Sequence, residues 1–134
     1  IGSKVDTMDA EQHDHILSIT SHLPHLIAYN IVNTTLNIQD KNETDVVKYS
    51  AGGLRDFTRI AASNPIMWRD IFIENKKNTS TMIDNFIANL EDLKKAIENE
   101  DRKKLEEIFE KTKKIREKIV KAGQDVKKPD FGRK

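Results

Sequence analysis

Apolar residues recur every three or four positions from Ile16 to Leu36, a spacing that is typical of an α-helix. Asp6, Thr7 and Asp9 are suitable caps for its start. The polar run from Asn37 to Asn42 is expected to end it. The apolar positions fall on more than one face: Ile16, Leu17, Ile19, Leu23, Leu26, Ile27, Ile31, Val32 and Leu36. We therefore expect this helix either at the centre of its domain or against a partner chain.

A second helix is predicted from about Thr44 to Ser63, although it would carry Gly52 and Gly53 in its interior. Each glycine there costs about 1 kcal/mol, which is tolerable where a backbone or a ligand must approach closely. The pair Asn64-Pro65 predicts the start of a third helix, because Asn is a good N-cap and Pro fits the first helical position.

The remainder of the chain predicts an antiparallel helical hairpin. Its first helix is expected to start at a cap formed by Thr79 or Ser80, and the polar residues 99–101 separate it from a second helix that ends at Gly123. Lys and Glu alternate along it at the spacing of a solvated helix face, so we expect neither a nucleic acid nor a membrane as partner. The segment 124–134 is expected to be a flexible surface tail.

Composition supports one all-α domain over residues 1–134, since 37% of the 134 residues are hydrophobic, 34% are charged, and Gly and Pro are few. The net charge of +1 does not suggest a polyelectrolyte partner. The sequence contains no Cys, which excludes disulfides and thiolate zinc sites and is compatible with the cytoplasmic location that we expect. Because Ile1 is not an initiator, we expect the chain to be a piece of a longer protein.

All four histidines lie between residues 13 and 25, so a metal site has to be considered. Glu11 and His25 would be about 20 Å apart along a helix. Only His22 and His25 could then share an ion, and two imidazoles make a weak site, so we predict no metal. Pro24 lacks an N–H for the carbonyl of Thr20, which predicts a bend and a polar notch at the two rings. The alternative is that both are ordinary core histidines.

Arg55, Asp56 and Arg59 put two cations and one carboxylate within five residues of one predicted helix. The planar guanidinium of Arg matches a carboxylate in a bidentate manner, and a neighbouring Asp can hold that group in place. The segment therefore predicts an anion site. The alternative is a structural ion pair between helices.

Two motifs carry a family resemblance: His22-Leu23-Pro24-His25, and the stretch from Arg55-Asp56-Phe57-Thr58-Arg59 to Trp68. In this order, and closely over roughly residues 9–75, the chain resembles the C-terminal helical domain of prephenate, arogenate and cyclohexadienyl dehydrogenases. The resemblance implies a dimerisation domain of the type found in 6-phosphogluconate dehydrogenase. It also implies a homodimer, in which this domain forms one wall of the cleft where prephenate or arogenate loses a hydride and carbon dioxide.

The resemblance also implies roles for individual residues. Arg59 matches the arginine that grips a substrate carboxylate, while His22 and His25 match residues that line the pocket for the substrate and for tyrosine as an inhibitor. Arg55 stands where many members carry lysine, and Asp56 matches its acidic partner. Trp68 matches a tryptophan that reaches towards the pocket of the other subunit.

The residues of this chain supply only one part of the active site that the resemblance implies. The sequence has no Gly-x-Gly-x-x-Gly turn, so NAD or NADP would bind to an N-terminal domain outside this chain, which would also hold the catalytic histidine. The chain alone is therefore expected to be inactive. The alternatives are another oxidoreductase of the same superfamily and a non-enzymatic interaction module. A single cavity lined by His22, His25 and Arg59 would favour the enzyme.

Overall fold

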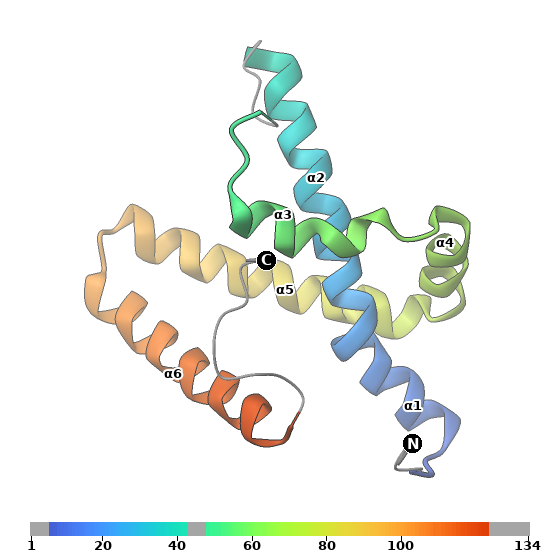
Figure 1. Cartoon of the computed structure of the whole chain (residues 1–134). Helices are drawn as coiled ribbons and strands as arrows, with labels where there is room; N and C mark the ends of the chain where they lie inside the picture. Colours follow the sequence, from blue (N-terminus) through green and yellow to red (C-terminus); the bar gives the residue numbers. More distant parts are fainter. Residues whose placement is uncertain (1–5, 43–47, 124–134) are drawn as a thin grey trace. The chain divides into compact units, whose positions relative to one another are not determined.

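The computed structural model describes residues 6–42 and 48–123, and within those ranges every regular element is a helix (Figure 1). The order is α1 (Ala10–Leu17), the π-helical turn η1 (Ser18–His22), α2 (Leu23–Asn42), α3 (Gly52–Thr58), the 3₁₀ turn η2 (Arg59–Ala62), α4 (Pro65–Glu74), α5 (Lys76–Glu98) and α6 (Arg102–Lys121). The all-helical fold class is confirmed. The chain divides into two compact units, Ile1–Asp84 and Asn85–Lys134, and α5 runs through the boundary.

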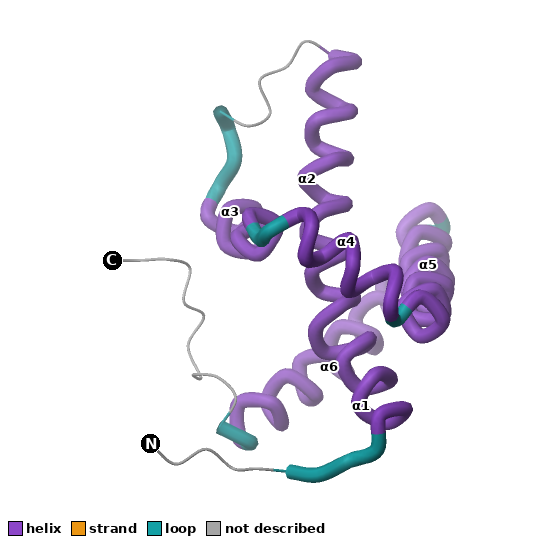
Figure 2. Tube along the Cα trace, turned by 90° about the vertical axis from the view of Figure 1, so that its right-hand side faces the viewer, coloured by secondary structure: helices purple, strands orange, loops and turns teal. Residues whose placement is uncertain are grey.

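The first predicted helix is present as α1, η1 and α2, which follow one another without an intervening loop (Figure 2). Asp9 caps it, since its carboxylate accepts a hydrogen bond from the N–H of Gln12 at 2.8 Å. The predicted end at Asn37 was wrong, because α2 continues to Asn42. Polar residues such as Asn, Gln, Asp and Lys cost less than about 0.7 kcal/mol each in a helix, and this stretch contains no Gly or Pro.

The second predicted helix is shorter than expected. It begins at Gly52, with Ala51 in extended conformation as its N-cap, whereas the predicted start at Thr44 lies outside the described residues. The two glycines therefore occupy the first helical turn and not the interior, where they would cost more. After Thr58 the helix tightens into η2, which packs on α2 together with α3.

The third helix, α4, starts as predicted, since the Asn64 side chain accepts hydrogen bonds from the N–H groups of Ile66 and Met67. The predicted caps Thr79 and Ser80 were wrong, because α5 begins at Lys76, directly after α4. Asn75 ends one helix and supports the next: its N–H donates to Ile71 and its carbonyl accepts from Thr79.

The second unit contains the predicted hairpin, in which α6 turns back from the end of α5 (Figure 1). The break at residues 99–101 is confirmed; Glu100 has a φ of 52°, and Asp101 caps α6 by accepting from the N–H of Lys104. Gly123 has a φ of 76°, which confirms it as the residue after the helix end. The predicted tail, 124–134, lies outside the described residues.

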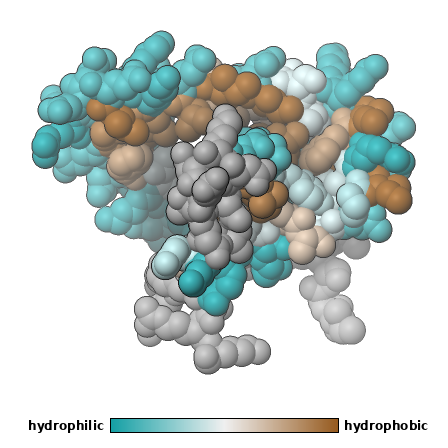
Figure 3. Space-filling view, turned by 90° about the horizontal axis from the view of Figure 1, so that it is seen from above, coloured by the Kyte–Doolittle hydropathy of each residue, from teal (hydrophilic) through white to brown (hydrophobic). Residues whose placement is uncertain are grey.

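Few apolar side chains are buried within the chain. Among the described residues, only Ala28, Trp68 and Ala96 are buried hydrophobic positions. Many large apolar side chains are exposed instead, and Figure 3 shows such side chains on one face of the molecule. They include Ile19, Val32, Leu36, Phe57, Ile66, Ile73, Ile87, Leu90, Ile97, Phe109 and Ile115. An apolar surface of this extent is typical of a protein that packs against a partner.

No helix in the described ranges is both long enough and apolar enough to cross a membrane.

Candidate functional site

Four aromatic rings from two helical segments form a compact group in the first unit, which we call the ring cluster: His22, His25, Trp68 and Phe72. The imidazole of His25 stacks on the indole of Trp68, with the ring centroids 3.6 Å apart and the planes 21° from parallel. His22 meets Trp68 and Phe72 edge to face at 6.3 and 6.4 Å. His22 and Trp68 are 7% and 6% exposed, so both are buried members of the site.

The π-helical turn η1 carries His22 as its last residue. Here the N–H of Leu23 donates to the carbonyl of Ser18, five residues back, so the turn holds one residue more than an α-helical turn. Pro24, whose missing N–H predicted a disturbance at this point, follows directly. The disturbance is present, but as a π turn and not as the simple bend that we expected. Such turns are frequent at functional sites.

His25 has a defined proton position. Its Nδ1 lies 2.9 Å from the carbonyl oxygen of Ser21. A carbonyl can only accept, so Nδ1 carries the hydrogen and donates it. In the neutral ring, Nε2 is then left as a hydrogen-bond acceptor. The polar notch predicted around Pro24 is thus partly filled by this histidine, which uses one of the local carbonyls.

Besides Trp68 and Phe72, Asn75 also contacts His22: its amide nitrogen lies 3.3 Å from Nδ1 of His22. The same amide nitrogen donates to the carbonyl of Asp14 at 2.7 Å. Burial lowers the pKa of His22 below its ordinary value of 6.5; nearby Asp14 opposes this, while His25 and His13 add to it. The folded site therefore favours a neutral His22.

Lowering the pH should weaken the fold through His22. Because its pKa is depressed in the folded chain, the unfolded chain binds more protons below pH 6.5, and the free energy of unfolding falls as the pH drops through that range. Well above pH 6.5, His22 is neutral in both the folded and the unfolded chain, so it no longer changes the free energy of unfolding. Urea unfolding between about pH 7.5 and pH 5 measures this. His22→Gln should flatten the dependence, and the exposed control His15→Gln should not; equal slopes in wild type and His22→Gln would contradict the prediction.

The basic segment is arranged differently from the sequence prediction. Asp56 faces its neighbour Arg55, with Nε and Oδ1 3.4 Å apart, and not Arg59. The reason is the change to 3₁₀ geometry: Thr58 has a φ of −90° and a ψ of 0°, so the α-helical spacing that put Arg59 over Asp56 ends before it. Arg59 is exposed and forms no ion pair with the described residues. Its guanidinium is therefore available to an anion.

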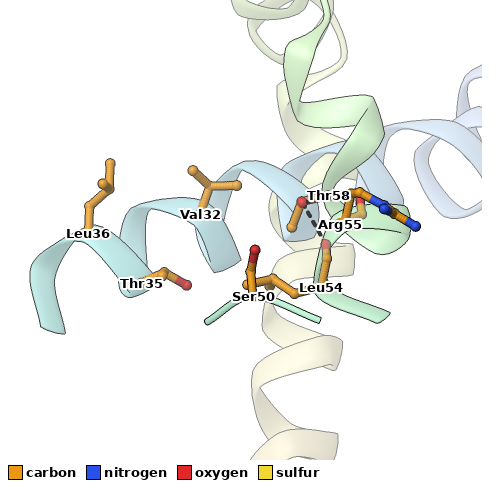
Figure 4. Close-up of a pocket in the computed structure, with 7 residues that line it drawn as sticks. All are labelled: Val32, Thr35, Leu36, Ser50, Leu54, Arg55 and Thr58. Carbon is orange, nitrogen blue, oxygen red and sulfur yellow. Dashed lines mark hydrogen bonds between the residues drawn. The ribbon is translucent and has the colours of Figure 1, made fainter. Parts of the chain in front are cut away.

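Two cavities lie near these residues in the first unit. One, of about 270 Å³, lies between α2 and α3, with Arg55 at its edge (Figure 4). It is lined by Val32, Thr35, Leu36, Ser50, Leu54, Arg55 and Thr58. The other, of about 480 Å³, lies between α2 and α4 and includes Trp68 and Phe72. His22, His25 and Arg59 line neither of these two cavities.

The sequence prediction named His22 and His25 as neighbours and Trp68 as a residue directed towards the other subunit, whereas within this chain Trp68 stacks on His25; it missed Asn75. Asn75 lies 53 residues from His22, and its position after a helix indicates only a helix end. The described ranges contain no group of three or more His, Cys, Asp or Glu side chains that could hold a metal ion. His13 and His15, the other two histidines, are exposed.

A family model for the prephenate dehydrogenase dimerisation domain matches residues 9–111. A cyclohexadienyl dehydrogenase from Zymomonas mobilis is 44% identical over 116 residues, which is 87% of this chain and 40% of that protein. A prephenate dehydrogenase from Bacillus subtilis is 36% identical over 110 residues, which is 82% of this chain and 29% of the relative. The chain thus spans less than half of the length of either relative.

Solved structures agree with the fold. A prephenate dehydrogenase from A. aeolicus, in complex with hydroxyphenyl propionate and NAD+, superposes with a TM-score of 0.82 at 43% identity. The match covers 88% of this chain and 41% of that one. An arogenate dehydrogenase from Synechocystis has a TM-score of 0.76 at 20% identity, over 86% of this chain and 42% of that one, and shows the same fold.

Proposed function

Because the chain belongs to the family of prephenate dehydrogenase dimerisation domains, we propose that it forms the dimerisation and substrate-binding part of an NAD(P)-dependent prephenate or arogenate dehydrogenase. The observation that carries this proposal is the ring cluster, which lies within the matched residues together with Arg59, an exposed cation that forms no ion pair with the residues that the structure describes. The enzyme from A. aeolicus, 43% identical, was solved with hydroxyphenyl propionate and NAD+, which supports an aromatic carboxylate as ligand class.

The proposed reaction has two bond changes. The substrate carbon that bears the hydroxyl group gives a hydride to the nicotinamide, which is reduced. The bond between the ring and its carboxylate breaks, its electron pair completes the aromatic ring, and carbon dioxide leaves. The nucleotide supplies the oxidising chemistry and belongs to the part of the protein outside this chain. The residues of this chain would bind and orient the substrate.

Arg59 is the proposed carboxylate anchor. Its guanidinium can donate two parallel hydrogen bonds to a carboxylate, and no described acidic group competes for it. The ring cluster would form an apolar wall with polar edges: Nε2 of His25 is an acceptor, because its Nδ1 is used by Ser21. Arg55 and Asp56 would supply a second charged pair near the substrate. Trp68 would contribute through its stacking on His25.

Kinetics test this proposal. The full-length protein should reduce NAD or NADP with prephenate or arogenate, which is followed by the absorbance of the reduced nucleotide. This chain alone should bind neither nucleotide, because it lacks the glycine-rich turn that holds a pyrophosphate. Absence of turnover with both substrates would overturn the proposed function. Tight nucleotide binding by this chain in calorimetry would overturn the division of roles between the two parts.

The chain is also proposed to form a homodimer. Its buried apolar core is small and its exposed apolar side chains are numerous, while obligate interfaces bury on the order of 2,000 Å² or more. Light scattering coupled to size exclusion should therefore give twice the mass of 15.4 kDa for the isolated chain. A monomer at micromolar concentration would contradict the prediction.

A further inference from the structure

Asn75 connects three parts of the first unit through one side chain. Its amide nitrogen contacts the carbonyl of Asp14 in α1 at 2.7 Å and Nδ1 of His22 in η1 at 3.3 Å. Its amide oxygen accepts from the Nδ2 group of Asn78 in α5 at 2.9 Å. Asn75 itself lies at the junction of α4 and α5, where its backbone serves both helices. Its side chain is therefore held at both ends.

These contacts determine which end of the amide faces His22. The carbonyl oxygen of Asp14 can only accept, so the atom of Asn75 beside it must be the NH₂ group. With the NH₂ group there, the amide oxygen of Asn75 faces Asn78 and accepts from its NH₂ group, so this contact is satisfied in the same orientation. The NH₂ group of Asn75 thus also faces Nδ1 of His22, and Nδ1 must accept. The proton of the neutral ring then lies on Nε2.

We propose that Asn75 is a positioning residue that fixes His22 as a neutral imidazole with its hydrogen on Nε2. His25 has the opposite arrangement, because Ser21 keeps its hydrogen on Nδ1. The Nε2 atoms of the two rings therefore differ: that of His22 is a donor, and that of His25, in the neutral ring, is an acceptor. A hydroxyl group that reached either ring would accept from His22 or donate to His25.

The surroundings of His22 agree with a neutral ring. The charged or titratable groups near it are Asp14 and His13 from α1 and His25 from α2. The side chains that meet it from α4 and the α4–α5 junction are Trp68, Phe72 and Asn75, which carry no charge. A proton on Nδ1 would put two donors face to face and break the contact with Asn75.

Nitrogen NMR of the ¹⁵N-histidine-labelled chain tests the proposal directly. In the wild type at neutral pH, His22 should show the Nε2–H tautomer and His25 the Nδ1–H tautomer. Asn75→Leu should release His22 into a mixture of tautomers, and Asn75→Asp should give a doubly protonated His22, because a carboxylate favours the cation. Asn89→Asp, the same change at an exposed position of α5, should leave His22 as in the wild type.

An Nδ1–H tautomer of His22 in the wild-type spectrum would overturn the proposal, whether or not the variants fold. An unchanged His22 tautomer in folded Asn75→Leu or Asn75→Asp would do the same. The assignment of the His22 tautomer does not rest on the proposed function. The role of this tautomer in substrate binding does rest on it. In a full-length enzyme that turns over prephenate or arogenate, Asn75→Leu should raise KM more than it lowers kcat. An unchanged KM together with an altered tautomer would overturn the role in binding alone.

Discussion

Replacing Arg59 by alanine in the full-length enzyme should lower kcat/KM by roughly 30- to 5,000-fold, which corresponds to about 2–5 kcal/mol of transition-state binding. The guanidinium is exposed in this chain and has no acidic partner among the described residues, so its charge is available to a substrate carboxylate. The cost is large because the substrate carboxylate would then be desolvated in the cleft without a partner. If the contact is equally strong in the ground and transition states, the loss should appear mainly in KM.

Two further variants separate this role from a structural one. Arg59→Lys should restore activity poorly, because an ammonium keeps the charge but cannot donate two parallel hydrogen bonds. Arg102→Ala removes an exposed arginine from the start of α6 and should leave kcat/KM unchanged. Melting temperatures are measured on the same samples. An unchanged KM with a lowered melting temperature in Arg59→Ala would reject Arg59 as the carboxylate anchor.

Replacing Trp68 by alanine should lower the free energy of unfolding by about 3–5 kcal/mol, the usual cost of removing a large buried aromatic side chain. Trp68 contacts three other rings, and it is one of the few buried apolar residues of the described chain. Trp68→Phe should cost much less, about 1–2 kcal/mol. The indole N–H has no hydrogen-bond partner in the described structure, so Phe loses no hydrogen bond.

Circular dichroism is the appropriate measurement, because Trp68 is the single tryptophan and its fluorescence is lost in both variants. Tyr49→Ala is the matched control, an aromatic residue that is 76% exposed, and it should change the free energy of unfolding by less than about 0.5 kcal/mol. Equal losses in Trp68→Ala and Trp68→Phe would show that the indole N–H does have an acceptor in solution.

Local sequence features predicted helix ends well where a single residue decides them. Asn64-Pro65 starts α4, and Gly123 follows the end of α6, because these residue types fit those backbone positions and few others. Prediction failed at helix ends that depend on small differences in helix propensity between residue types. Nothing in the run Asn37 to Asn42 forbids a helix, and α5 starts at Lys76, with only Asn75 between it and the end of α4.

The candidate site was only partly visible in the sequence. His22 and His25 could be selected because they flank Pro24 in an apolar helix, and Trp68 because of the family resemblance. The tautomer of His22 could not be predicted from the sequence, because it depends on Asn75, which is near His22 only in the folded chain. The orientation of Arg59 could not be predicted from the sequence either. It depends on a switch from α to 3₁₀ geometry at Thr58, and no residue type there demands that switch.

The π turn at Ser18–His22 makes the length of this segment more important than its composition. It places one extra residue in a continuous helical stretch, and each residue of an α-helix rotates the chain by about 100°. The wider turn absorbs that residue by unwinding locally. One more residue inserted beside the turn would not be absorbed and would rotate α1 against α2 by about 100°. The Asp14 carbonyl would then leave Asn75, although every side chain of the ring cluster would still be present. Natural variants of this domain should therefore tolerate substitutions in the turn far better than insertions beside it.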